Sequence, residues 1–166
     1  MVIGCSGAGK STFAHQLANV TGLPLVHLDQ LFWQAGWEPV ARPEFLQRVE
    51  VAVAAPAWIM DGTNSTTFEL RVPRADRIFW LRRGRVACVG RVLRRVASSY
   101  GRVRPDMAAG CPEKLDLAFL RYVWTFNRVY DPRITAALDR HAAWGRTIVL
   151  SSDREAQSAL DALHLD

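Results

Sequence analysis

Five short apolar runs recur along this chain, separated by longer segments in which apolar residues return every three or four positions. Apolar runs rich in β-branched and aromatic residues predict buried strands, whereas the longer spacing predicts amphipathic helices. We expect strands at residues 1–3, 24–28, 58–60, 77–81 and 147–150. We expect helices at residues 11–20, 43–55, 68–72, 84–100 and 112–141, and a last one from about residue 154.

The regular alternation of strands and helices indicates an α/β fold with a five-stranded parallel sheet covered by helices on both faces. The 166 residues contain no repeat or low-complexity linker, so we expect a single domain over 1–166. In such sheets ligands bind beyond the carboxyl ends of the strands. Because proline disrupts a helix interior, the long helical segment is expected to break or kink at Asp131-Pro132.

The most specific motif is G-C-S-G-A-G-K-S at residues 4–11, which matches the phosphate-binding P-loop pattern G-x-x-x-x-G-K-S. Its glycines allow successive N–H groups to surround a phosphate, and the helix that follows points its positive dipole end there. We expect Lys10 to reach the β- and γ-phosphates and Ser11 to offer its hydroxyl to Mg²⁺. The sequence therefore predicts ATP and Mg²⁺ as ligands. The residues expected to bind the nucleotide are Gly4, Ser6, Gly7, Ala8, Gly9, Lys10, Ser11, Thr12 and Arg91.

Two aspartates directly follow predicted strands, at the edge of the sheet where the phosphates would lie. Asp61 is a candidate to hold Mg²⁺ through water together with Ser11, and the alternative is a structural role in an Asp-Gly turn. Asp29 is a candidate catalytic residue that orients or deprotonates an acceptor hydroxyl, and the alternative is a helix or turn cap. His27 precedes Asp29 on a buried strand and is expected to be a hydrogen-bonded core histidine.

Arginine dominates the basic residues, with 19 arginines among 21 and a net charge of +5. Eleven of them fall between residues 71 and 104, where Asp76 is the only acid. Guanidinium groups bind phosphate oxygens bidentately, so Lys10, Arg95 and Arg102 are expected to be catalytic, with residues 100–112 acting as a lid. The same cluster also suits a nucleic-acid backbone, or a solvated basic face.

The remaining composition is that of an ordinary globular protein, with 49% apolar and 22% charged residues. No apolar run approaches the roughly 18 residues that span a bilayer, and the chain opens without a secretory signal. We therefore expect a cytoplasmic protein that does not contact a membrane. Cys5, Cys88 and Cys111 show no metal-ligand spacing and are expected to be reduced thiols. Phe32, Trp33 and Trp37 either cover core or stack on an aromatic acceptor such as a nucleobase.

Taken together, these motifs resemble the bacterial DNA topology-modulation proteins, which are P-loop proteins related to adenylate kinases. The matching segments cover nearly the whole chain: residues 4–11, His27-Leu28-Asp29, Leu31-Phe32-Trp33, Gly36-Trp37, Asp61-Gly62, residues 102–107 and Gly110-Cys111-Pro112-Glu113-Lys114. The resemblance implies a three-layer adenylate-kinase-like P-loop fold with a five-stranded parallel sheet and a short lid. It also implies binding of ATP and Mg²⁺.

The chain departs from adenylate kinases after the third strand, where they carry Asp-Gly-Phe-Pro-Arg and this chain carries Asp61-Gly62-Thr63-Asn64-Ser65. The departure argues against AMP as acceptor, although Arg42 and Arg71 are candidates to bind a monophosphate. We expect a kinase that transfers the γ-phosphate of ATP to an unidentified nucleoside- or nucleotide-type small molecule. The alternative is a nucleic-acid-binding ATPase or regulator that affects DNA topology.

Overall fold

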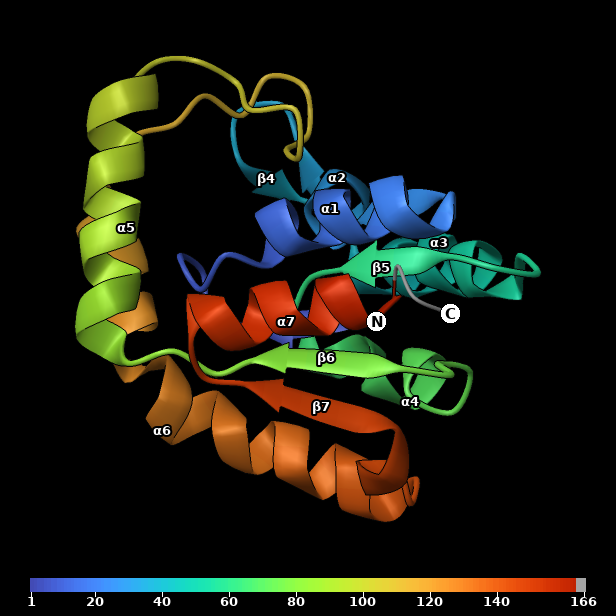
Figure 1. Ribbon diagram of the computed structural model, residues 1–166. Helices are drawn as coiled ribbons and strands as arrows, with labels where there is room; N and C mark the ends of the chain where they lie inside the picture. Colours follow the sequence, from blue (N-terminus) through green and yellow to red (C-terminus); the bar gives the residue numbers. More distant parts are fainter. Residues whose placement is uncertain (164–166) are drawn as a thin grey trace.

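A computed structural model describes residues 1–163 of the chain. Its centre is an all-parallel five-stranded sheet in the order β2-β5-β1-β6-β7, so the first strand of the chain lies in the middle (Figure 1). The strand bounds are β1 Val2–Gly4, β2 Leu25–His27, β5 Ile59–Asp61, β6 Ile78–Leu81 and β7 Thr147–Leu150. Each lies inside or within one residue of a predicted strand, which confirms the α/β fold class with a parallel sheet.

Helices flank the sheet. α1 packs against α7, whereas α3 packs against α4 behind the sheet in the view of Figure 1. The helix bounds are α1 Lys10–Thr21, α2 Leu28–Phe32, α3 Arg42–Ala54, α4 Phe68–Arg71, α5 Arg85–Ser99, α6 Leu117–Arg140 and α7 Asp153–Leu163, with 3₁₀ turns at Ser65–Thr67 and Trp144–Arg146. Within residues 1–163, no helix combines the length and apolar character needed to cross a membrane.

The helix expected over residues 112–141 differs from prediction at its start and at Pro132, whereas its end agrees within one residue. It begins at Leu117, because the Asp116 carboxylate accepts hydrogen bonds from the N–H groups of Ala118 and Phe119 and so caps the helix. It also continues through Pro132, so of the break or kink predicted at Asp131-Pro132 the break was wrong. Packing of the apolar face of α6 against the core, through residues such as Phe126 and Ile134, outweighs the local cost of the proline.

Residues 30–42, where the sequence predicted neither a strand nor a helix, contain regular structure. They contain the end of α2 and a small antiparallel hairpin of β3 (Trp33–Gln34) and β4 (Glu38–Pro39). The long connection between α5 and α6, residues 100–116, reaches across to this hairpin (Figure 1). We refer to residues 32–39 as the aromatic hairpin and to residues 100–116 as the connecting segment.

The core lies on both faces of the sheet, with β1, β5 and β6 buried along their whole length. One cluster packs α1, α5, α6 and α7 against the sheet, and a second packs α3 and Leu28 against Met60 of β5. Arg71 is also buried completely. Its guanidinium donates to Thr67 Oγ1 at 2.8 Å, to the Gly62 carbonyl at 3.0 Å and to the Asn64 carbonyl at 3.1 Å. These three bonds use the side chain to hold the turn after β5, so Arg71 is not free to bind an acceptor monophosphate.

Replacing Arg71 with methionine is expected to destabilise the fold by about 3 kcal/mol or more, because it leaves buried carbonyl groups without a donor. The matched control is Arg74→Met, three residues away, where the side chain is exposed. The control is expected to change the free energy of unfolding by no more than about 0.5 kcal/mol. Urea unfolding at pH 7 measures both. Equally small decreases in the free energy of unfolding of the two variants would contradict a structural role for the Arg71 guanidinium.

Candidate functional site

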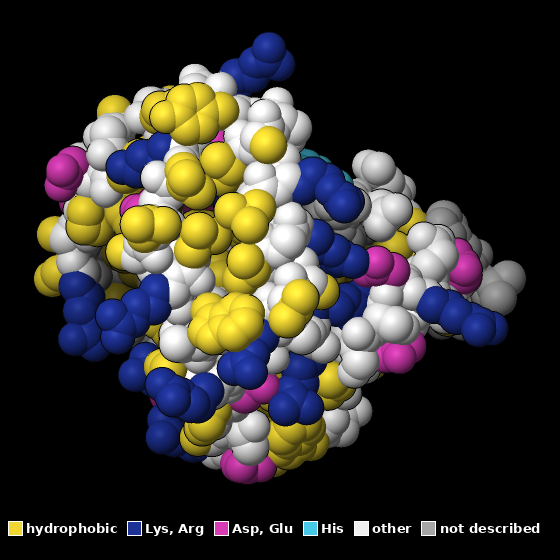
Figure 2. Space-filling view, turned by 90° about the vertical axis from the view of Figure 1, so that its left-hand side faces the viewer, with side chains coloured by type: hydrophobic (Ala, Val, Ile, Leu, Met, Phe, Trp, Pro, Cys, Tyr) yellow, Lys and Arg dark blue, Asp and Glu magenta, His cyan; other side chains and the backbone are white. Residues whose placement is uncertain are grey.

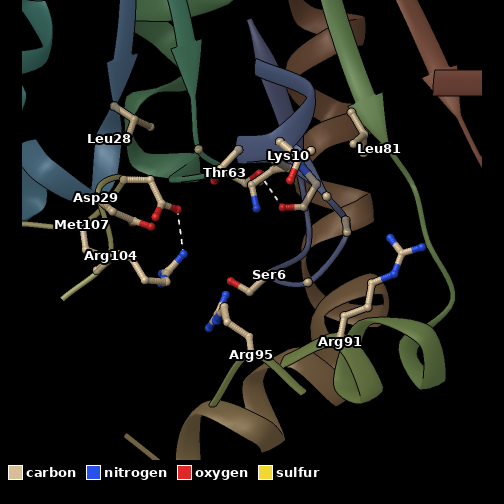
Figure 3. Close-up of a pocket in the computed structure, with 18 of the residues that line it drawn as sticks. Ser6, Lys10, Leu28, Asp29, Thr63, Leu81, Arg91, Arg95, Arg104 and Met107 are labelled. Carbon is tan, nitrogen blue, oxygen red and sulfur yellow. Dashed lines mark hydrogen bonds and ion pairs between the residues drawn. The ribbon is translucent and has the colours of Figure 1, made fainter. Parts of the chain in front are cut away.

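A cleft of about 1140 Å³ opens at the carboxyl ends of the strands. It exceeds the roughly 300–1,000 Å³ typical of a pocket for one small ligand. The residues that follow β1, β2, β5 and β6 all contribute to its lining, because parallel strands end at the same edge of the sheet. Figure 3 shows Asp29, Arg104 and Met107 on one side of the opening and Arg91 and Arg95 on the other, with Ser6 between them.

The glycine-rich loop, residues 4–11, connects β1 to α1 at the centre of the cleft. Gly4, Gly7 and Gly9 have φ values of 143°, 81° and 95°, a region that L-residues with a Cβ rarely adopt. A Cβ on Gly7 would also collide with the carbonyl oxygen of Cys88. The loop therefore needs glycine at these positions to stay close to α5. All of its residues from Ser6 to Ser11 line the cleft, as do Gly4 and Thr12.

The start of α1 provides polar groups that face the cleft. The first N–H groups of the helix, at Lys10, Ser11 and Thr12, have no intrahelical acceptor. Gly9, the residue before them, makes no side-chain cap. The Lys10 ammonium donates to the carbonyl oxygen of Cys5 at 3.0 Å and so lies across the loop. This arrangement concentrates N–H groups and a cation where an anion would enter.

Asp61, at the end of β5, is buried and meets two side chains through a single oxygen. Ser11 Oγ donates to Asp61 Oδ2 at 2.7 Å, and His27 Nδ1 lies 3.1 Å from the same atom. Asp61 Oδ1 is buried without a hydrogen-bond partner within residues 1–163. Burial by itself would raise the pKa of Asp61, but the bonds from His27 and Ser11 and the charge of Lys10 lower it overall. Asp61 is therefore an anion with one oxygen left free.

His27 is buried and bonded to Asp61, as expected of a core histidine. It orients the carboxylate that meets Ser11. Thr63 is a residue that sequence reasoning missed. Its hydroxyl accepts from the N–H of Gly4 at 2.6 Å and donates to the Gly4 carbonyl at 2.8 Å, so it ties the turn after β5 to the glycine-rich loop. The next residue, Asn64, caps the 3₁₀ turn Ser65–Thr67 by accepting from the Thr66 N–H.

Asp29 lies in the first turn of α2, and its carboxylate forms no hydrogen bond or ion pair with any residue in 1–163. It caps neither a helix nor a turn, which argues against the alternative that Asp29 is a capping residue. Asp29 is an exposed residue that lines the cleft. Desolvation of its carboxyl group by the cleft walls raises the pKa of Asp29, while the charges of Lys10 and Arg104 oppose the rise and those of Asp61 and Asp106 add to it.

Three of the arginines that line the cleft, Arg91, Arg95 and Arg104, are paired with acids. Arg91 donates to Asp153 at 2.6 Å, and its other terminal nitrogen lies 3.7 Å from where a Cβ on Gly9 would stand, which places it beside the glycine-rich loop. Arg95 donates to Oε1 of the buried Glu113 at 3.0 and 3.1 Å. Burial lowers the pKa of Arg95 and nearby Arg104 lowers it further, while Glu113 opposes the shift.

Arg104 lines the cleft, whereas Arg102, predicted from the sequence to be catalytic, is exposed and does not. Arg104 donates to Glu113 Oε2 at 2.8 Å and to Asp106 at 2.7 Å. Glu113 thus joins α5 to the connecting segment through two guanidinium groups. The signal that could have indicated this pairing is the presence of Asp106 and Glu113 beside Arg104 in a region otherwise poor in acids.

The three cysteines are buried and unpaired, in agreement with the prediction of reduced thiols. The Cys5 thiol donates to the Val123 carbonyl at 3.7 Å, and neighbouring Cys88 together with burial raises the pKa of this thiol. A protonated, buried thiol favours packing over reactivity for Cys5.

Comparison with known proteins adds no assignment. No protein-family model matches this chain, and no curated protein matches it. Among residues 1–163, no group of three or more His, Cys, Asp or Glu side chains is arranged to hold a metal ion.

Proposed function

We propose that this protein is a kinase of the P-loop class, with an adenylate-kinase-like fold, that transfers the γ-phosphate of ATP to a small hydroxyl compound. The contact that carries the proposal is the 2.7 Å bond between Ser11 Oγ and Asp61 Oδ2 at the start of α1. In P-loop enzymes a loop Ser or Thr and a strand-end Asp hold Mg²⁺ beside the phosphates. The sequence resemblance to DNA topology-modulation proteins and a cytoplasmic location remain predictions compatible with this proposal.

The donor phosphates would bind the free N–H groups at the start of α1, with Lys10 leaving the Cys5 carbonyl to meet a phosphate oxygen. Ser11 and Asp61 fit Mg²⁺, because the buried Asp61 Oδ1 lacks a partner within residues 1–163 and hard cations prefer oxygen ligands. The bound Mg²⁺ supplies charge neutralisation at the β- and γ-phosphates. Ser11 would hold the ion through its hydroxyl oxygen, and Asp61 would hold it through water.

The arginines around the loop suit neutralisation of charge that develops during transfer. Arg91 and Arg95 extend from α5, and Arg104 extends from the connecting segment, which we propose acts as the lid. In this structure Asp153 and Glu113 bind these guanidinium groups. Phosphate oxygens would exchange for the carboxylates when ATP binds. Asp29, across the cleft, would accept the proton of the acceptor hydroxyl.

The direct test is ADP formation from ATP and Mg²⁺ across a panel of nucleosides, nucleotides and sugars. We expect at least one hydroxyl compound to stimulate ADP formation well above the rate with ATP alone, with phosphate appearing on the acceptor. A panel with no stimulation, although ATP binds, would remove the kinase proposal in favour of a nucleotide-binding scaffold.

The nucleic-acid alternative has less support, because much of the arginine cluster is already used inside the protein. Arg71 and Arg83 are buried, and Arg82 pairs with Asp131. The face formed by α5 in Figure 2 carries apolar side chains between its basic ones, where a continuous basic stripe would be expected for a nucleic-acid backbone. Binding of duplex DNA that weakens steeply with salt would revive this alternative.

Asp61→Asn is expected to raise the Mg²⁺ concentration needed for half-maximal activity, with a smaller effect on nucleotide affinity measured without Mg²⁺. Asparagine keeps an oxygen that can accept from Ser11 but lacks the negative charge that attracts the cation. A Mg²⁺ titration of initial rates, with ATP binding measured separately by calorimetry, distinguishes the two effects. An unchanged Mg²⁺ requirement would contradict a metal role for Asp61.

A further inference from the structure

The end of the cleft next to Asp29 is lined by aromatic side chains that are held in place by contacts within the protein. Phe32, Trp33 and Trp37 all line the cleft and contact one another edge to face, with ring centroids 4.7 Å apart for Phe32 and Trp33 and 5.5 Å apart for Trp33 and Trp37. Met107 of the connecting segment packs against the two tryptophans and lies next to Asp29 in Figure 3. These side chains form a wall, which we call the aromatic wall.

The strained backbone of Trp37 indicates that contacts with the connecting segment hold this residue in place. Its φ is 66°, a conformation that is rare for a bulky residue and costs about 1–3 kcal/mol. The indole N–H donates to the Pro112 carbonyl at 3.0 Å, which anchors the ring against the connecting segment. Gly36 N–H also donates to the Gly110 carbonyl at 2.8 Å, and a Cβ on Gly110 would stand 2.6 Å from Cβ of Ala35. The hairpin and the segment therefore fit closely enough to hold the strained tryptophan.

The charges at this end do not suit an acceptor phosphate. Two carboxyl groups, those of Asp29 and Asp106, line the cleft here. The cations whose charges act on the pKa of Asp29 are Lys10 and Arg104. Lys10 belongs to the glycine-rich loop, and Arg104 is already bonded to Asp106 and Glu113. The two arginines that the sequence suggested for a monophosphate do not reach this end: Arg71 is bonded to backbone groups in the interior, and Arg42 does not line the cleft.

From these observations we propose that the aromatic wall and Asp29 form an acceptor site for an uncharged aromatic hydroxyl compound of the nucleoside class, and that this site disfavours the corresponding monophosphates. The proposal rests on the function proposed above. A planar ring stacks on the face of one of the two tryptophans and meets the other edge to face, because their rings are inclined at 74° to each other. A hydroxyl of the attached sugar donates to Asp29. That hydroxyl oxygen forms the new bond to the γ-phosphorus, the bond from the γ-phosphorus to the bridging oxygen of ADP breaks, and the hydroxyl proton passes to Asp29.

Lys114 is an exposed cation beside this wall, with its ammonium 5.9 Å from the centre of the Trp37 ring. Like Asp29 and Asp106, it lines the cleft. A monophosphate could gain from Lys114 if its phosphate lay against that ammonium, beside Trp37. The Lys114→Met variant is included in the test for this reason.

The test measures binding by calorimetry, with Mg²⁺ and a non-hydrolysable ATP analogue saturating the donor site. The probes are the common nucleosides and their 5′-monophosphates. We expect one or more nucleosides to bind at least about tenfold more tightly than their own monophosphates. Trp33→Leu and Trp37→Asn should each weaken nucleoside binding about tenfold, since stacking on one aromatic ring is worth that much or more. Asparagine tolerates the positive φ at residue 37, and the ATP analogue should bind both variants unchanged.

Asp106→Asn provides a gain-of-binding test. Removing this carboxylate frees one nitrogen of Arg104 and removes one negative charge, so the ratio of monophosphate to nucleoside affinity should rise several-fold. Trp124→Leu on the outer face of α6, outside the cleft, is the control and should leave both affinities unchanged. The Lys114→Met variant should keep the preference for nucleosides.

Three outcomes would overturn the proposal, and they are distinguishable. Tighter binding of monophosphates, lost in Lys114→Met, would show a nucleotide site. Binding of the ATP analogue without binding of any nucleoside would refute the acceptor class while leaving the kinase proposal intact. Failure of the ATP analogue to bind at all would remove the proposed function and this inference with it.

Discussion

Lys10→Ala is expected to reduce kcat/KM for ATP by about 10²–10³ or more, the usual loss when one group that stabilises transition-state charge is removed. The ammonium is the cation of the glycine-rich loop, and alanine leaves no charge to meet the β- and γ-phosphates. Stability should change little, because the side chain is not part of the core and its one hydrogen bond is to the Cys5 carbonyl. Initial-rate kinetics and urea unfolding measure the two effects.

Arg74→Ala is the control for loss of one positive charge, because Arg74 is exposed and lies outside the cleft. It should leave the kinetics unchanged. If Lys10→Ala retains wild-type kcat/KM for ATP, the glycine-rich loop is not a phosphate site and the proposed function fails.

Asp29→Asn is expected to lower kcat by about 10²–10⁴, the range for a positioned acid–base group. The affinity for ATP should hardly change, because Asp29 faces the acceptor end of the cleft. Added Mg²⁺ should not rescue the variant. Rescue by Mg²⁺ would instead indicate that Asp29 is a metal ligand. Asp76→Asn, at an exposed position outside the cleft, is the control and should keep wild-type activity.

The raised pKa of Asp29 predicts a difference between the wild type and Asp29→Asn in how activity depends on pH. Only the ionised carboxylate can accept a proton, so wild-type kcat/KM should rise as pH increases through this raised pKa. The Asn variant should lack that rise. Because the pKa of Asp29 is higher in the folded state than in the unfolded chain, ionisation of this group lowers the free energy of unfolding at neutral pH. This loss of stability disappears once the pH falls below the ordinary pKa of an aspartate.

Asp29→Asn should therefore match or exceed wild-type stability at pH 7, and the two proteins should converge in acid. Urea unfolding at pH 7 and in acid tests this difference. A loss of stability at pH 7 with kcat nearly intact would identify Asp29 as a structural residue and contradict its proposed role.

The sequence determined the parallel sheet and most of the helices, because both depend on the local spacing of apolar residues. It also located the glycine-rich loop, since the positions of Gly4, Gly7 and Gly9 follow from a backbone with positive φ. Gly22 follows the same rule at the end of α1, where it has a φ of 68° and its N–H donates to the Ala18 carbonyl. These predictions were possible because each feature depends on the local conformation of the backbone.

Long-range pairing was decided by the tertiary structure. The sequence predicted that Arg95 and Arg102 are catalytic residues. The fold instead joins Arg104 to Arg95 through Glu113 and leaves Arg102 exposed. Likewise, the continuation of α6 through Pro132 depends on its packing against the core. Which side chains meet across the cleft depends on how distant segments dock, and neither periodicity nor motif spacing encodes that contact.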